Sequence, residues 1–512
     1  MRLQSLLALL GLVVLSLGCS KDSLDKTLSS LPASDPMSRA EMDQIVEKFL
    51  HEQNTPFRWE TADNRMLWSA SVRSDSIMSL GYKPADAVNV AQRLGLIDTR
   101  TEEWRAVRNK LIQLVVEETN KEFPELNATP KDLFPRLEWD GLPTLDVKLF
   151  SQRIIEQLRQ MPEVRYIEPM GYGLGELEQR SDSGCGAPPA SNIPSADYTT
   201  TAPNVKIPWT FSHSSMNVPS AWNTSTGAGI KVALIDTGTS PSQPKIGSQF
   251  NSGYSQGRSL ERLGTHVTGW WWWTQNEGPD DQCGHGTQMS GLIAAPRGDG
   301  GATVGVAYNC NLKAFRSCSD VIINASSEKN GVRDALYISA NDNAVKIISM
   351  SIGDVFYSST VADGIYYAYN NNKLIFAAAG TSLTWTSWWG VIFPANMTQT
   401  VAVTGIKDSG NMQKCSSCHD GPEVDFVSVM QRSSDNDRTA LTLAMSGNQP
   451  SYVGGSSAAT ATTAGIAALV WATNPSQTRT QVLDRLKNAA SIYPNRDNNF
   501  GWGTIDAAAA VN

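Results

Sequence analysis

The feature that most constrains the fold is a set of apolar runs between residues 231 and 406. These runs are "KVALID" (231–236), "VKIISMSI" (345–352), "KLIFAAA" (373–379) and "QTVAVTGI" (399–406). A strand that is apolar on both of its faces is buried on both faces, as in a parallel sheet. Stretches with a helical pattern, such as "GTQMSGLIAA" and "ADGIYYAYNNN", lie between or beside the runs. The pattern predicts an α/β fold in which helices cover both faces of a parallel sheet.

A smaller α+β region is predicted before this domain. Residues 20 to about 172 are charge-rich and helical in pattern, and Ser38 with Glu41 forms a capping box before an apolar stripe. The later stretches "LDVKLF", "SQRIIEQLRQM" and "EVRYIEP" predict a strand, a helix and a strand. From Gly171 to about Pro203 the chain is rich in Gly, Ser, Pro and Thr, which is typical of a linker. The predicted division is 19–172, a linker at 173–204, and a main domain at 205–512.

The first 18 residues have the pattern of a signal peptide. One arginine precedes an apolar run of about a dozen residues, which is short for a membrane span. Gly18-Cys19 resembles a bacterial lipobox, in which Cys19 would be lipidated after cleavage. The alternative is ordinary secretion with Cys19 inside the removed peptide. Both alternatives predict an exported protein, which meets a membrane only through a lipid anchor at Cys19.

Six cysteines remain after Cys19, and an even number in an exported chain predicts up to three disulfides. They are Cys185, Cys283, Cys310, Cys318, Cys415 and Cys418. Fifteen pairings are possible, so the sequence leaves the connectivity open. The net charge of -8 gives no reason to expect a nucleic-acid partner.

Three residues with chemical potential lie at the ends of buried elements. Asp236 ends an apolar strand, His285 lies between glycines where an apolar helix begins, and Ser457 stands at the start of another helix. Functional groups of parallel sheets gather at the carboxyl ends of the strands. Backbone N–H groups and the helix dipole beside Ser457 would stabilise an oxyanion. Each residue also has a simpler role open to it, since Asp236 can cap its own turn and Ser457 can cap its helix.

Together these motifs resemble those of the subtilisin-like serine proteases. The order Asp, His, Ser is the order found in subtilisin. The stretches "ALIDTG", "GHGTQMSG" and "GGSSAATATTAG" match the family's three catalytic motifs, and the resemblance extends from about Val205 to the C-terminus. It implies that Ser457 is the nucleophile, that His285 is the general base and acid, and that Asp236 orients the histidine. Ser456 is the nearest rival nucleophile, and the family spacing selects Ser457.

The resemblance also implies a substrate cleft and a propeptide. The substrate backbone would lie along "SMSIG", which contains Ser351, Ile352 and Gly353, and main-chain hydrogen bonds would supply most of its affinity. Ala378, Ala379 and Gly380 would form one wall of an open, uncharged side-chain pocket. The segment at about 145–170, which ends in "VRYIEPMG", resembles the family's propeptide. Residues 22–144 have no assignment by resemblance.

One position departs from the family pattern. The residue after "AAAG" is asparagine in the family and donates to the oxyanion, whereas here it is Thr381. Thr381 and the N–H of Ser457 are the candidate oxyanion donors. The leading hypothesis is therefore a serine endopeptidase, made as an exported zymogen, that acts on proteins or peptides and binds its own propeptide. The alternative is a catalytically silent or very slow subtilisin fold that binds peptides.

Other motifs give weaker indications. "CSSCH" (415–419) fits a c-type haem attachment site, but it also matches a family segment, and a disulfide is favoured there. Tryptophans at 270–273 and at 385, 388 and 389 could grip substrate side chains or pack insertions onto the domain. The acidic runs "GPDDQC" and "PRGDGG" lack a complete calcium-ligand spacing. No cofactor is predicted and no metal site is assigned, although members of the family often bind calcium.

Overall fold

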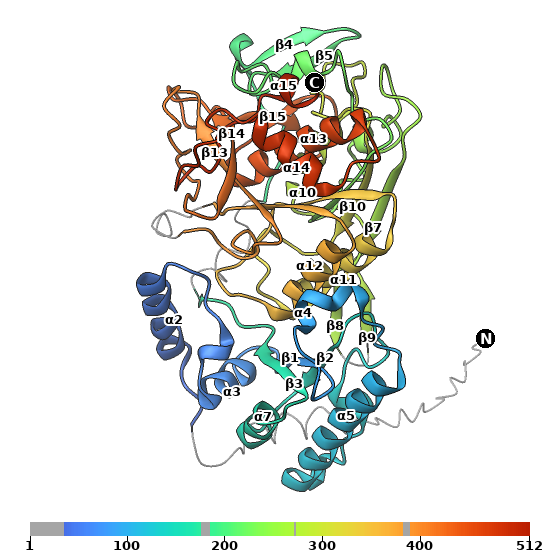
Figure 1. The fold of residues 1–512 in the computed structure, drawn as a ribbon, viewed down its shortest axis with the longest axis vertical. Helices are drawn as coiled ribbons and strands as arrows, with labels where there is room; N and C mark the ends of the chain where they lie inside the picture. Colours follow the sequence, from blue (N-terminus) through green and yellow to red (C-terminus); the bar gives the residue numbers. More distant parts are fainter. Residues whose placement is uncertain (1–34, 176–184, 271–272, 382–389) are drawn as a thin grey trace, which may run out of the picture.

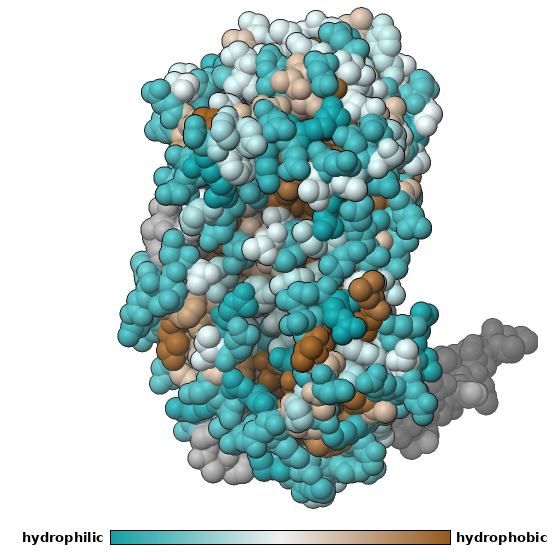
Figure 2. Space-filling view, viewed as in Figure 1, coloured by the Kyte–Doolittle hydropathy of each residue, from teal (hydrophilic) through white to brown (hydrophobic). Residues whose placement is uncertain are grey.

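The computed structural model describes residues 35–175, 185–270, 273–381 and 390–512. Figure 1 shows an N-terminal body, blue to teal, below a larger body that contains the later described residues. Each body has its own cluster of buried hydrophobic residues. The visible surface is mostly hydrophilic, with a few brown apolar patches on the lower body (Figure 2). Within the described ranges, no helix has the length and apolar character needed to cross a bilayer.

The larger body is built on a seven-stranded parallel sheet, which confirms the predicted α/β class. Its strand order is β14-β13-β12-β11-β6-β10-β7. The strands are β6 (Lys231–Asp236), β7 (Leu260–Gly264), β10 (Asn311–Arg316), β11 (Val345–Met350), β12 (Leu374–Ala378), β13 (Val401–Lys407) and β14 (Val424–Gln431).

Helices cover both faces of this sheet, as the apolar runs predict. Val232 and Leu234 of β6 belong to one buried cluster, together with residues of α10 (His285–Ala294) and α13 (Gly455–Thr473). Their neighbours Ala233 and Ile235 belong to another, with residues of α11 (Ser326–Asn341) and α12 (Ser359–Asn370). Because successive side chains of a strand point to opposite faces, one strand serves two hydrophobic cores.

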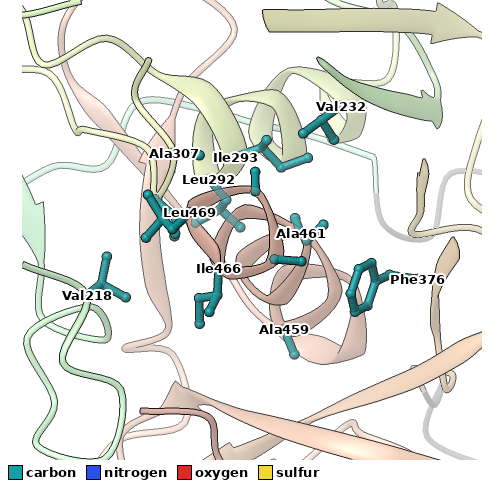
Figure 3. Close-up of a cluster of buried hydrophobic side chains, with 14 of the residues drawn as sticks. Val218, Val232, Leu292, Ile293, Ala307, Phe376, Ala459, Ala461, Ile466 and Leu469 are labelled. Atoms are coloured by element: carbon teal, nitrogen blue, oxygen red, sulfur yellow. The ribbon is translucent and has the colours of Figure 1, made fainter. Parts of the chain in front are cut away.

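Helix α13 passes through the middle of the larger core. Figure 3 shows its Ala459, Ala461, Ile466 and Leu469 beside side chains of α10 and β12. Small residues let neighbouring elements approach closely, and a Cβ added at Gly465 would lie 2.7 Å from Cβ of Val306. The small-residue composition therefore fixes the position of the helix, and with it the position of Ser457 in its first turn.

The N-terminal body combines helices with a three-stranded antiparallel sheet of order β2-β1-β3. The strands are β1 (Ile77–Tyr82), β2 (Thr144–Lys148) and β3 (Val164–Pro169), and the longer helices are α2 (Arg39–Gln53), α3 (Asn64–Val72), α5 (Glu102–Glu122) and α7 (Gln152–Arg159). The expected capping box of Ser38 and Glu41 is present. The structure differs from the sequence prediction in one respect. A module at about 145–170 lacks its central strand, since β1 comes from the stretch that had no assignment.

The shorter elements complete the chain. They are α4 (Val90–Arg93), α6 (Pro130–Leu133), α9 (Val218–Ala221), α14 (Arg479–Asn488), α15 (Ala507–Ala510), β4 (Tyr198–Thr201), β5 (Val205–Pro208), β8 (Val267–Trp270), β9 (Trp273–Asn276), β15 (Ala440–Leu443) and β16 (Pro450–Val453).

The second half of the predicted linker is built into the larger body. Strand β4 pairs antiparallel with β5. Asp197, just before β4, is fully buried and accepts hydrogen bonds from Arg432, from Arg438 and, at 2.7 Å, from the hydroxyl of Tyr452. Burial alone would raise the pKa of Asp197, but these hydrogen bonds outweigh it and the pKa is lowered. The Ser, Thr and Pro content of this stretch predicted a linker, because the residues that Asp197 contacts lie far away in sequence.

An ion pair and a helix cap join the two bodies. Arg165 of β3 pairs with Asp363 of α12, and both side chains are largely buried. Glu168 accepts from the backbone N–H groups of Ser359, at 2.9 Å, and Thr360, at 3.2 Å. The carboxylate therefore satisfies N–H groups that would be unpaired at the start of α12.

Residues of the N-terminal body also contact helix α11. Asp146 of β2 accepts from Asn330 at 2.7 Å and from Arg333 at 3.4 Å. The ammonium group of Lys329 donates to the carbonyl oxygen of Met170 at 2.8 Å. The sheet of the N-terminal body thus lies against the two helices that flank the residues 351–357.

Candidate active site

Asp236 and His285 form a buried pair at the carboxyl end of the sheet. Asp236 ends β6 and is fully buried, and His285 begins α10 and is 3% exposed. The two side chains meet at 2.8 Å, between Nδ1 of the histidine and Oδ1 of the aspartate. Gly284, at φ 99°, adopts the left-handed conformation that places the histidine at the helix start. The structure therefore brings together two residues that are 49 positions apart.

The environment of His285 favours its charged form. Burial lowers the pKa of the imidazole, but the charge and hydrogen bond of Asp236 raise it more. Asp281 and Asp320 add in the same direction, so the net pKa is raised. Neighbouring negative charge stabilises an imidazolium, which is the form that a general base reaches after it accepts a proton.

Ser457 shares a pocket with His285, whereas Ser456 does not line it. The pocket has a volume of about 440 Å³ and includes both residues in its lining. Ser457 is partly exposed. Its hydroxyl donates to the carbonyl oxygen of Ser351 at 3.3 Å. Ser456 is fully buried, and its hydroxyl accepts from the N–H of Gly380 at 3.1 Å. Exposure thus favours Ser457 as the reactive hydroxyl.

Thr381 lies at the same pocket, beside the turn that begins α13. Its Oγ1 is 3.1 Å from Oγ of Ser456 and accepts from the N–H of Ser456 at 3.3 Å. A Cβ added at Gly455 would lie 2.7 Å from this Oγ1. The threonine hydroxyl therefore lies next to the backbone at the start of α13, where it already contacts Ser456.

Only some of the residues predicted to bind substrate line the pocket. Gly353 lines the pocket, whereas Ser351, Ile352, Ala378 and Ala379 are buried behind it. Gly380 lies against the ring of His419, since an added Cβ would be 2.4 Å from its Nδ1.

Sequence reasoning missed several residues of the pocket wall, namely Cys185, Gly186, Ile392, His419 and Tyr452. Cys185 is bonded to Cys283, two positions before His285, and the N–H of Gly186 donates to the carbonyl oxygen of Cys283 at 2.7 Å. The only signal for this arrangement was the presence of two cysteines.

The "CSSCH" motif forms a local disulfide. Cys415 and Cys418 are joined to each other, so the thiols that a haem would use are already bonded. His419 is buried, its Nδ1 is 3.0 Å from the carbonyl oxygen of Gly390, and burial lowers its pKa to about 4. The imidazole of His419 is therefore neutral at pH 7. Cys310 and Cys318 are buried free thiols.

Aspartates of the acidic run "GPDDQC" have partners within the chain. Asp280 pairs with Arg262, and Asp281 accepts from the backbone and side chains around the start of α10. Among the residues that the structure describes, no three His, Cys, Asp or Glu side chains are grouped to hold a metal ion.

Most of the tryptophans that could grip substrate side chains or pack insertions lie outside the described residues. Trp271, Trp272, Trp385, Trp388 and Trp389 belong to the undescribed segments. Strands β8 and β9 pair antiparallel in this part of the chain.

The fold and the site define a class, an α/β hydrolytic enzyme with a histidine, a carboxylate and a serine at one edge of a parallel sheet. The subtilase family model matches residues 227–503, more than half of the chain. The chain belongs to the subtilase family and is a serine endopeptidase.

The chain is also similar to curated relatives and to a solved structure. Alkaline elastase YaB of Bacillus sp. (strain YaB) is 27% identical over 374 residues, which cover 73% of this chain and 81% of the relative. M-protease of Shouchella clausii (strain KSM-K16) is 26% identical over 374 residues, which cover 73% of this chain and 80% of the relative. The crystal structure of MycP1 from Mycobacterium smegmatis has a TM-score of 0.47 and 21% identity, with 64% of this chain and 88% of that chain covered.

Asp354 is a buried carboxyl group next to Gly353 in the pocket wall. It is 3% exposed, and its Oδ1 accepts from the N–H of Val355 at 2.7 Å. Its Oδ2 has no hydrogen-bond partner within the described residues. Burial raises its pKa to about 7, although the charge of Lys329 works in the opposite direction. The folded protein therefore holds a proton on Asp354 more tightly than the unfolded chain does.

This raised pKa predicts a pH-dependent stability. The stabilisation is complete below the ordinary pKa of an aspartate and is lost as the pH rises through about 7. Asp354→Asn removes the titration. Between pH 4 and pH 8 the apparent Tm of the wild type should fall by about 5 °C or more relative to the variant. Thermal scans of both proteins across this range test the prediction, and parallel pH profiles would contradict it.

Proposed function

We propose that this enzyme cleaves peptide bonds through an Asp236-His285-Ser457 triad. The single observation that carries the proposal is the buried 2.8 Å contact of Asp236 with His285 in the wall of the pocket that Ser457 also lines. Nδ1 of His285 donates to Asp236, which leaves Nε2 to take the proton of the Ser457 hydroxyl. The Ser457 oxygen attacks the substrate carbonyl and forms an acyl-enzyme. The imidazolium returns its proton to the leaving amine, and water then releases the acyl group.

The tetrahedral intermediate would be stabilised at the start of α13. The N–H of Ser457 and the positive end of the helix dipole face the developing oxyanion in this proposal. Thr381 supplies a hydroxyl in place of the family's amide. Because that hydroxyl already contacts Ser456, its contribution requires it to exchange partners, which favours a slow enzyme.

We also propose that residues 19–172 are the propeptide of a zymogen. Support comes from the hydrophobic cluster of the N-terminal body, which Val355 and Phe356 of the larger body join, and from its buried ion pair and helix cap on the larger body. A cut in the linker before Cys185 would release the propeptide. The disulfide to Cys283 would then keep Cys185 in the pocket wall of the mature enzyme.

Other features support a proposal of export. The signal-like residues 1–18 and the lipobox-like Cys19 precede the described residues. The two disulfides support an oxidising compartment. We propose that the protein is a cell-envelope lipoprotein or is secreted.

A second candidate function is peptide binding without rapid catalysis. The engaged hydroxyl of Thr381 is the observation that favours it. In that case the pocket would bind extended peptides, and Ser457 would react slowly or not at all.

A fluorophosphonate probe distinguishes the two functions. The wild type should label at Ser457, because the probe needs only an activated serine and an oxyanion site. Ser457→Ala should not label, and Ser456→Ala is the matched control that should still label. A size shift in the wild type that is lost in Ser457→Ala would in addition indicate self-processing. A folded wild type, freed of residues 19–172, that fails to label would contradict the protease mechanism.

Thr381 provides a test of the oxyanion site. Thr381→Asn should raise kcat, because the longer amide can reach the oxyanion. Thr381→Val keeps the shape and removes the hydroxyl. It should lower kcat by up to about 10²–10³-fold, which corresponds to about 3 kcal/mol. This magnitude is the one found in subtilisin itself for the loss of one such donor. Steady-state kinetics on one peptide substrate provides the measurement. Unchanged kcat in both variants would remove Thr381 from the oxyanion site.

A further inference from the structure

The main-chain groups expected to hold a substrate already have partners within the chain. The N–H of Gly353 donates to the carbonyl oxygen of Val321 at 3.0 Å, and the N–H of Ile323 donates to the carbonyl oxygen of Gly353 at 3.1 Å. Ile322 and Gly353 form a parallel bridge. Val321 and Ile322 also line the active-site pocket. We call residues 321–323 the closing strand.

This pairing competes directly with a substrate. An extended peptide that adds to the Gly353 edge must use the same N–H and carbonyl groups for its hydrogen bonds. A backbone N–H donates to one good partner at a time, so the peptide and the closing strand cannot both pair fully with Gly353. The neighbouring carbonyl of Ser351 is also engaged, by the Ser457 hydroxyl at 3.3 Å.

A buried carboxylate fastens the closing strand at both of its ends. Glu328, in the first turn of α11, is 2% exposed. One of its oxygens accepts from the N–H and the hydroxyl of Ser319. The other accepts from the N–H groups of Asn324, at 3.1 Å, and Ala325, at 3.2 Å. Charge-assisted bonds of this kind are stronger than neutral ones. Residues 319–325 are therefore held as a loop around Glu328.

The N-terminal body braces the same region from the other side. A Cβ added at Gly173 would lie 3.1 Å from Cβ of Asn324, just after the closing strand. Phe57 pairs with the continuation of the substrate edge. Its N–H donates to the carbonyl oxygen of Val355 at 2.8 Å, and its carbonyl accepts from the N–H of Tyr357 at 2.8 Å.

We infer that Val321–Ile323 is an autoinhibitory strand, which occupies the place of the substrate backbone at Gly353 and must move aside before an extended peptide binds. Glu328 is the positioning residue that sets how readily it moves. The inference rests on the proposed function in one respect, namely that an extended peptide binds at the Gly353 edge. A ligand as short as a single residue does not need the Gly353 edge, and Ser457 remains in the open pocket.

The test uses the full chain with Ser457→Ala, which removes catalysis from the measurement. Binding of a fluorescent octapeptide is followed by anisotropy in three proteins: this parent, parent with Glu328→Gln, and parent with Asp408→Asn. The amide of Glu328→Gln cannot accept all the bonds of the carboxylate, so the loop loosens. Asp408 is the matched control, because its carboxylate likewise accepts from a loop residue, Ser433, but has no bond to residues 319–325. The expected result is an affinity at least about tenfold tighter for Glu328→Gln alone.

An N-methyl scan of the peptide shows whether the tighter binding uses the edge. In Glu328→Gln, methylation of one particular backbone nitrogen should cost about tenfold in Kd, because it removes the donor to Gly353. In the parent, no single methylation should matter. Ile323→Pro, which deletes the N–H that bonds Gly353, provides a second variant if Glu328→Gln does not fold.

Equal Kd values in the folded variants and the parent would overturn the inference, as would a parent that already shows the position-specific methyl effect. Fluorophosphonate labelling of the same proteins with Ser457 restored reports separately on the proposed function. The two ideas can therefore fail independently.

Discussion

The structure depends on one buried contact, the 2.8 Å bond between Asp236 and His285 at the end of the central strand β6. A fully buried carboxylate is costly unless it is paired, and the sheet supplies the pairing by bringing the start of α10 over the end of β6. The raised pKa of His285 is the electrostatic consequence. Helix α13 completes the arrangement, because its small residues let it cross the core and deliver Ser457 to the same pocket.

The chain places several of its own segments around that pocket. The segment at Cys185 and Gly186 is tied to the residue two positions before His285, and the closing strand covers the Gly353 edge. Farther from the pocket, Phe57 pairs with Val355 and Tyr357. The N-terminal body sits on α11 and α12, and Glu328 lies at the start of α11. If the N-terminal body is released as we propose, its release and the displacement of the closing strand would act on connected elements, because Asn330 and Glu328 both belong to α11.

The sequence was sufficient for the sheet and for placing Asp236, His285 and Ser457 at the ends of buried elements, because both depend on local patterns. Four apolar runs predicted the parallel strands, and Asp236, His285 and Ser457 each stood at the end of a recognisable element. It was insufficient where a residue's role depends on a distant partner. Asp197 looked like part of a linker, although Arg432 and Arg438 bury it. The bond between Ile323 and Gly353 has no local signature at all, since any backbone can form it.

The central claim, that Asp236 holds the Nδ1 proton of His285, is tested most directly by proton NMR of the full chain in water. A proton in a short, buried bond to a carboxylate exchanges slowly and resonates far downfield. The account predicts such a resonance in the wild type and in Ser457→Ala, and its loss in Asp236→Asn, where the amide no longer favours that tautomer. A wild type without the resonance, or an Asp236→Asn protein that keeps it, would contradict the account.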